Sequence, residues 1–147
     1  MHLKISATVT LWVNRVIFLV VAALVFLLPY LMTLYTQARP LYGFSQTAIY
    51  LAFYACAPVT LFALWNIEQL IRNILQENVF IRANARRISL LRWCCLLVSF
   101  ICLPATFFYL PLIFMVIIMG FLGLVVSVVA NVIAAAVEIR EENDMTI

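Results

Sequence analysis

Few residues of this 147-residue sequence could carry out acid–base, nucleophilic or metal chemistry. The single histidine is His2, and the cysteines are Cys56, Cys94, Cys95 and Cys102. Zinc sites use cysteine and histidine pairs two to four residues apart with further ligands, which this pattern does not offer. No cysteine or serine has a histidine that could activate it in a catalytic pair. We therefore expect a protein that is not an enzyme and that uses no cofactor or metal.

The four cysteines fit a packing role better than a redox role. They lie in or near apolar runs, and free cysteine behaves as a small buried apolar residue. Cys94 and Cys95 are adjacent and so point in different directions on a helix. A disulfide near a cytoplasmic membrane face is disfavoured because thiols stay reduced there. Lipidation of Cys94 or Cys95 is a minor alternative.

The apolar background identifies the class of protein. The chain is 67% hydrophobic and only 10% charged, whereas soluble domains carry about 25% charged residues. The apolar residues form blocks of about 20, the length that crosses a bilayer as a helix. We predict an all-α, four-helix transmembrane bundle that forms one domain over residues 1–147. The expected spans are 16–35, 48–65, 88–109 and 112–137.

The first span could also be a secretory signal peptide, because Thr36-Gln37-Ala38 is a weak cleavage-like triplet. An apolar run of about 20 residues exceeds the usual 7–15 of a signal peptide. A retained membrane span is therefore the favoured interpretation.

The basic residues predict the orientation. Eight of the nine lysine and arginine residues fall on the side of the termini and the central segment, and only Arg39 falls in an outer loop. The positive-inside rule places both termini and the central segment in the cytoplasm. No span carries an ionisable residue near its middle. Since ion pathways generally need such residues, coupled transport by a single chain is disfavoured.

Small residues recur along the fourth span at steps of three and four. Such residues let helix backbones approach closely in lipid. The favoured interpretation is the internal contact with a neighbouring helix, and a homodimer face is the alternative, with the adjacent Asn131 bonding a partner. The small residues are Gly120, Gly123, Ser127, Ala130 and Ala134.

The segment between the second and third spans is the only long polar stretch. Ile67, Leu70, Ile71, Ile74 and Leu75 recur at helical spacing with polar residues between them. This pattern predicts an amphipathic helix, which either extends the second span or lies along the membrane surface.

A basic cluster follows at Arg82, Arg86 and Arg87. It can fix topology and contact anionic lipid headgroups, or it can dock an acidic sequence. That sequence could be the chain's own tail from Glu138 onward or a soluble partner. We expect the tail to be an otherwise disordered peptide. Its acceptor residues are Glu141, Glu142, Asn143, Asp144 and Thr146.

Two pieces of sequence resemble a known family. In NILQENVFIRANARRISLLRW, Phe80 stands four residues before Asn84, which is followed by Arg86 and Arg87; the second piece is the terminal EIREENDMTI. Together they resemble the bacterial membrane proteins gathered as domain of unknown function 2975. That resemblance implies four helices, no enzymatic activity and a bacterial plasma membrane. The family commonly has Thr or Ser and then Pro where this chain has Ile81 and Arg82, so the helix that follows should lack a side-chain cap.

Family members are often encoded beside a small helix-turn-helix repressor, which implies a regulatory protein partner. We therefore expect a binding protein that engages a cytoplasmic partner through Phe80, Asn84, Arg86, Arg87 and the tail. We expect no direct contact with nucleic acid. The alternatives are an oligomeric pore or transport component, built as a homo-oligomer in the lipid bilayer, and a membrane scaffold.

Overall fold

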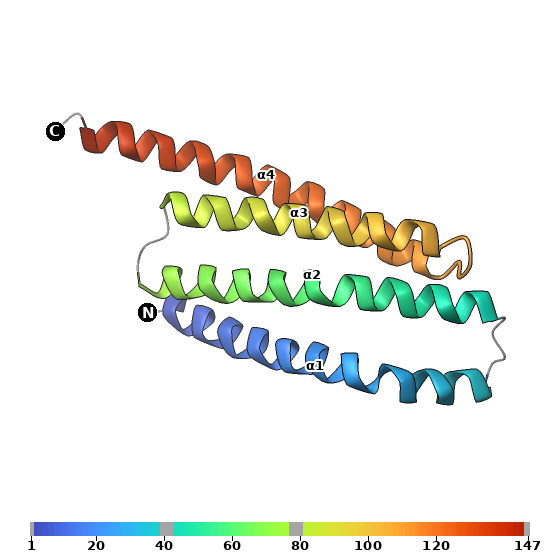
Figure 1. The fold of residues 1–147 in the computed structure, drawn as a ribbon. Coiled ribbons are helices and arrows are strands. Elements are labelled where there is room, and N and C mark those ends of the chain that lie inside the picture. Colours follow the sequence, from blue (N-terminus) through green and yellow to red (C-terminus); the bar gives the residue numbers. More distant parts are fainter. Residues whose placement is uncertain (1, 39–42, 77–80, 146–147) are drawn as a thin grey trace.

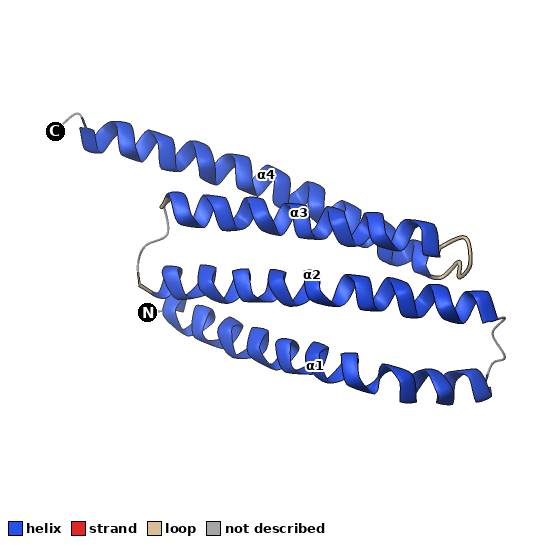
Figure 2. Cartoon of the chain, viewed as in Figure 1, coloured by secondary structure: helices blue, strands red, loops and turns tan. Residues whose placement is uncertain are grey.

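The computed structural model describes residues 2–38, 43–76 and 81–145, with only the backbone described for residues 2–5 and 144. It confirms the all-α, four-helix architecture predicted from the sequence (Figures 1 and 2). All four helices are long and apolar enough to cross a membrane. The helices are α1 (His2–Ala38), α2 (Gly43–Leu75), α3 (Arg82–Ala105) and α4 (Leu112–Met145).

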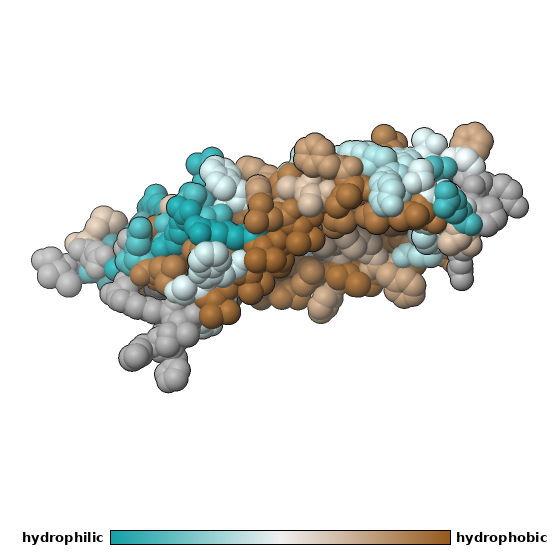
Figure 3. Space-filling view, turned by 90° about the horizontal axis from the view of Figure 1, so that it is seen from below, coloured by the Kyte–Doolittle hydropathy of each residue, from teal (hydrophilic) through white to brown (hydrophobic). Residues whose placement is uncertain are grey.

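The four helices lie side by side in chain order. α1 packs on α2, α2 on α3 and α3 on α4, and no other pair of helices is in backbone contact within the described residues. Figure 1 shows both termini and the α2–α3 connection at one end of the molecule, which we call the terminal end. The opposite end, with the α1–α2 and α3–α4 connections, is the far end. An apolar band covers the middle, and hydrophilic residues gather toward the ends (Figure 3).

Aromatic residues mark the two membrane–water boundaries. Trp12, Trp65 and Trp93 are exposed on α1, α2 and α3 toward the terminal end, and tryptophan is enriched at such boundaries. The 23 steps from Trp12 to Tyr35 on α1 correspond to about 35 Å at about 1.5 Å per residue. A hydrocarbon core is about 30 Å thick. The residues of α2 after Trp65 therefore lie beyond the boundary at the terminal end.

Two helices continue beyond the predicted spans of 48–65 and 112–137. α2 runs without a break to Leu75, so the amphipathic segment extends the second span and does not lie along the membrane surface. α4 continues to Met145, and the expectation of a disordered tail is wrong for the described residues. No glycine or proline follows Gly123, and glutamate, alanine and arginine favour helix. The apolar span and the acidic tail therefore form one continuous helix.

α3 begins and ends earlier in the sequence than its predicted span of 88–109. It begins after Ile81 with no side-chain cap hydrogen bond, as the departure from the family pattern predicted. It ends at Ala105, four residues before the expected limit of 109. The N–H of Thr106 turns back to donate to the carbonyl oxygen of Leu103 at 3.2 Å. The turn to α4 then occupies residues 106–111.

Candidate functional site

Polar side chains connect the helices at the terminal end, and each adjacent pair of helices has its own contact. Between α1 and α2, Arg15 donates from Nε and Nη2 to Oε1 of Glu68 at 3.3 and 3.2 Å. Arg72 donates to the same oxygen at 2.7 Å. Deeper in this interface, Asn14 Nδ2 donates to the carbonyl oxygen of Leu64 at 3.1 Å. Together these contacts fix the position of α1 along α2.

The carboxylate of Glu68 is held in its charged form. Its hydrogen bond from Arg72, and then that from Arg15, lower the pKa of this carboxyl below its usual value. The Glu68 side chain is 19% exposed, so the ion pairs are partly shielded from water. Opposite charges at this distance favour the ionised state. Glu68 therefore serves as a negative contact point for cations from two helices.

The α2–α3 contact is a pair of amides. Asn73 Nδ2 on α2 donates to Oδ1 of Asn84 on α3 at 2.7 Å, and Asn84 is only 1% exposed. Buried polar groups need hydrogen-bond partners. The pair therefore favours the one alignment of α2 and α3 in which the two amides meet. Asn84 was predicted as a functional residue, whereas Asn73 was missed. The sequence feature that could have identified Asn73 is its position as a polar residue beside the apolar face of an amphipathic helix.

The α3–α4 contact is an ion pair that we call the clasp. Arg82 Nε donates to Oε1 and Oε2 of Glu141 at 2.7 and 2.9 Å, and its Nη2 donates to Oε2 as well. Arginine forms such forked contacts with carboxylates readily. The pairing lowers the pKa of Glu141 and raises the pKa of Arg82. The end of α4 thus contacts the first residue of the basic cluster in its own chain.

The clasp closes one side of a small pocket of about 290 Å³ between α3 and α4. Arg82 and Glu141 share this pocket with Ala85, Ala134 and Glu138. Its walls therefore combine one cation, two carboxylates and apolar methyl groups. Both clasp side chains stay in contact with water, since they are 82% and 37% exposed. The contact is therefore accessible to a competing charged group.

The other two basic residues of the cluster, Arg86 and Arg87, have no partner among the described side chains. Arg86 is exposed and Arg87 is half-buried, and among the described side chains neither forms a hydrogen bond or an ion pair. Glu142 and Asn143 are exposed on the last turns of α4. Phe80 and Thr146 lie outside the described residues, and the side chain of Asp144 is not described.

An apolar crevice of about 410 Å³ lies beside these polar contacts. The part of α2 after Trp65, which we call the α2 extension, contributes Ile67, Leu70 and Ile74 from its apolar face. α4 contributes Val129 and Ile133 among others. Asn84 on α3 is the only polar residue among those lining it. The α2 extension therefore presents part of its apolar face to a groove instead of packing all of it inside the chain.

The small-residue stripe on α4 faces α3. A Cβ built on Gly123 would lie 2.9 Å from Cδ2 of Leu96, and one on Gly120 would lie 3.4 Å from Oγ of Ser99. Ala130 is 4% exposed. A homodimer through the Gly123 part of the stripe would therefore require α3 to move away.

The stripe is less tightly packed toward the terminal end, from Ser127 to Ala134. Arg92 on α3 donates from Nη1 to Oγ of Ser127 at 3.4 Å, so Ser127 also faces α3. Ala134 lines the clasp pocket. Asn131 is exposed beside the stripe, and it does not share the burial of Ala130. The small residues and Asn131 thus have different environments although they are close in sequence.

The described residues of the terminal end combine charged side chains with an apolar surface. Among the described residues, no group of three or more histidine, cysteine, aspartate and glutamate side chains could hold a metal ion. Among the described side chains, Arg86 and Arg87 have no partner, the clasp is exposed, and an apolar crevice lies at the same end of the molecule. Charged residues of this kind steer and orient a partner, and apolar crevices hold it.

A model of one protein family matches residues 36–147, under the description Protein of unknown function (DUF2975). The matched residues contain all of α2, α3 and α4, and therefore the amide pair, the clasp and the apolar crevice. No match was found among curated proteins or among solved structures.

Proposed function

The chain belongs to the family described as Protein of unknown function (DUF2975), and we propose that it is a non-enzymatic regulatory protein that binds a soluble protein at the terminal end. We place that end in the cytoplasm of a bacterium, with the helices in the plasma membrane. Eight of the nine lysine and arginine residues support this orientation. A protease-cleavable tag at the C-terminus should then be cut in inside-out vesicles and protected in intact spheroplasts.

The observation that carries the proposal is the contrast among neighbouring arginines. Arg15, Arg72 and Arg82 are each paired with a carboxylate of the fold. Arg86 and Arg87 have no such partner among the described side chains. They stand on a helix that Asn84 holds in place one turn away. A fixed pair of unpaired cations suits an acidic surface on another protein.

The apolar crevice supplies the second half of the surface. It lies next to Asn84 and is walled by the α2 extension and α4. A partner helix could place apolar side chains there while its acidic residues reach Arg86 and Arg87, since helices commonly bind by laying an apolar face in a groove. The small helix-turn-helix repressor implied by the family resemblance is the specific candidate. The membrane protein would hold it away from DNA without contacting DNA itself.

The clasp could open when a partner binds, because its ion pair can exchange one carboxylate for another. Glu141 occupies Arg82 in the free chain, and an acidic partner residue could replace it. Exposed ion pairs are weak and are screened by salt, so such an exchange needs little energy. We therefore expect partner affinity to fall as the salt concentration rises.

Reversal of the two unpaired charges tests the proposal. The Arg86→Glu/Arg87→Glu chain should recover at least tenfold less soluble partner from native membranes than the unchanged chain. The matched control is Arg86→Lys/Arg87→Lys, which keeps the charge and should keep most of the partner. Equal recovery by the unchanged and charge-reversed chains would contradict the proposal. Recovery of only membrane subunits or further copies of the chain would favour the oligomeric pore or the scaffold.

A further inference from the structure

Two cysteines on neighbouring helices are in contact inside the membrane-spanning part. Sγ of Cys56 on α2 lies 3.7 Å from Sγ of Cys102 on α3. Cys102 is 4% exposed and Cys56 is half-buried. All four cysteines are free thiols. The two residues are 46 positions apart in sequence, and only the packing of α2 on α3 brings them together.

The two sulfur atoms are in van der Waals contact and are not bonded. An S–S bond is about 2.05 Å long, so the two sulfur atoms need to approach by less than about 2 Å. Cys94 and Cys95 are successive residues of α3 and point in different directions. They provide an internal comparison for any test of thiol reactivity.

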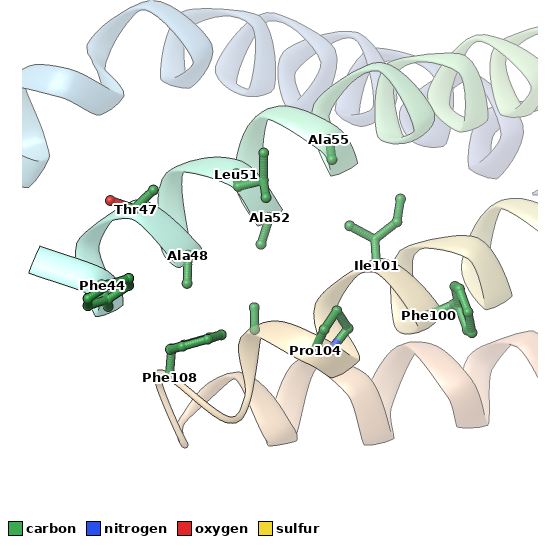
Figure 4. Close-up of a pocket in the computed structure, with 11 residues that line it drawn as sticks. Phe44, Thr47, Ala48, Leu51, Ala52, Ala55, Phe100, Ile101, Pro104 and Phe108 are labelled. Atoms are coloured by element: carbon green, nitrogen blue, oxygen red, sulfur yellow. The ribbon is translucent and has the colours of Figure 1, made fainter.

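An apolar pocket of about 470 Å³ lies between α2 and α3 in the far half of the molecule. Figure 4 shows Ala48 and Ala52 pointing from α2 toward α3, with Pro104 and Phe108 on the other side. The single polar side chain of its lining is Thr47, which donates to its own backbone at Gly43 at 3.0 Å. The pocket therefore suits a ligand with an apolar body.

The thiol pair lies about one helical turn from residues that line this pocket, and neither cysteine is itself a lining residue. Cys56 is one helical turn beyond Ala52 on α2, and Cys102 is about one turn before Ala105 on α3. Ala52 and Ala105 both line the pocket. The volume is within the range of about 300–1,000 Å³ that small-molecule sites have.

The surroundings restrict what could oxidise the two thiols. Charged species are very costly in an apolar environment. An oxidant whose reaction releases protons or ions between the helices is therefore disfavoured. The oxidant must dissolve in lipid and take up both electrons together with both protons. Quinones have these properties, and their rings and tails are apolar enough for the pocket.

We propose that Cys56 and Cys102 are a redox-active pair that a lipid-soluble quinone, bound in this pocket, oxidises to a disulfide. Two S–H bonds break and one S–S bond forms. The two electrons and two protons pass to the two carbonyl oxygens of the quinone, which becomes the quinol. The product is a covalent link between α2 and α3. The proposal does not depend on partner binding at the terminal end.

The test uses the full reduced chain in lipid vesicles without oxygen, with decylubiquinone as the probe. We expect a mass loss of two hydrogen atoms, a peptide containing Cys56 linked to Cys102, and one quinol formed per chain. Cys56→Ser and Cys102→Ser should each abolish all three signals. Cys94→Ala/Cys95→Ala should leave them unchanged. No disulfide, a disulfide to Cys94 or Cys95, or a quinone attached to one thiol would overturn the proposal.

A second comparison tests whether the quinone acts from the pocket. Ala52→Phe places a ring in the pocket and should slow oxidation by decylubiquinone at least tenfold. It should leave oxidation by diamide, a small permeant oxidant, unchanged. Equal rates with decylubiquinone in both chains would overturn the assignment of the pocket. Ala48→Phe serves as the second variant if Ala52→Phe does not elute as a folded protein.

Discussion

The two interfaces of α3 are built differently. Against α4 it meets glycines, and the Cβ position of Gly123 lies only 2.9 Å from Leu96. Against α2 it leaves two apolar pockets of about 470 and 370 Å³. Helices in lipid associate largely through van der Waals packing, and unfilled space loses those contacts. The α3–α4 interface is therefore the fixed part of the structure, and the α2–α3 interface is the adaptable part.

Polar contacts compensate for the open packing of α2 on α3. The Asn73–Asn84 pair lies at the terminal end. At the far end, Ser45 Oγ on α2 donates to the carbonyl oxygen of Phe108 at 2.9 Å. The thiol contact and both pockets lie between them. A ligand or an oxidant would therefore act on the α2–α3 interface more readily than on the α3–α4 interface.

The largest effect should come from filling the tight interface. Gly123→Leu forces a side chain onto Leu96, which is already too close for a methyl group. Overpacking costs about 1–3 kcal/mol and occasionally more. Thermal unfolding in detergent should show a clearly lowered midpoint. The control is Gly120→Ala, whose added methyl would meet Ser99 at 3.4 Å. Similar midpoints for both variants would show that the α3–α4 interface is not the tight one.

The next effect should come from the buried amide at the open interface. Asn84→Ala leaves the Asn73 amide without this acceptor, and an unsatisfied buried group costs about 1–3 kcal/mol. Hydrogen exchange of the α2 extension should become faster. Asn131→Ala removes an exposed amide of α4 and should change exchange little. If the two substitutions behave alike, the amide pair does not hold the interface.

Opening the clasp should have a smaller and local effect. Arg82→Glu should speed exchange of the last two turns of α4, and Arg82→Glu/Glu141→Arg should restore protection. Arg82 lowers the Glu141 pKa in the folded chain, so the contribution of the pair is present at neutral pH. It is lost as the pH falls through that pKa, which lies below the ordinary value of about 4.3. Protection that is unchanged by acid and by charge reversal would contradict this role.

The smallest effect should follow Ser45→Ala at the far end. Loss of the hydrogen bond to Phe108 should cost about 1 kcal/mol or less, because such bonds contribute about 0.5–1.5 kcal/mol and this one is exposed. The matched control is Thr33→Val, whose hydroxyl bonds only within α1. Denaturant titration in mixed micelles would measure both. A loss as large as that of Asn84→Ala would mean that the far end controls the interface.

Local sequence patterns predicted what depends on local chemistry. The apolar blocks gave the four helices, and helical spacing gave the amphipathic face that ends in Leu75. The choice of Glu141 as the partner of Arg82 needed the crossing of α3 and α4, which no pattern within one segment contains. The contact of Cys56 with Cys102 likewise depends on how α2 and α3 align. The helical continuation to Met145 was missed because its acidic residues were interpreted as solvated tail.

The most direct measurement is the recovery of a soluble partner from native membranes in mild detergent, read by mass spectrometry. The intact chain would be compared with one that ends after Val137, which keeps the apolar part of α4 and lacks Glu141. The proposed binding mode predicts a soluble protein with the intact chain and at least as much of it with the shortened chain, because Glu141 no longer occupies Arg82. The same membrane subunits with both chains, and no soluble protein with either, would contradict it.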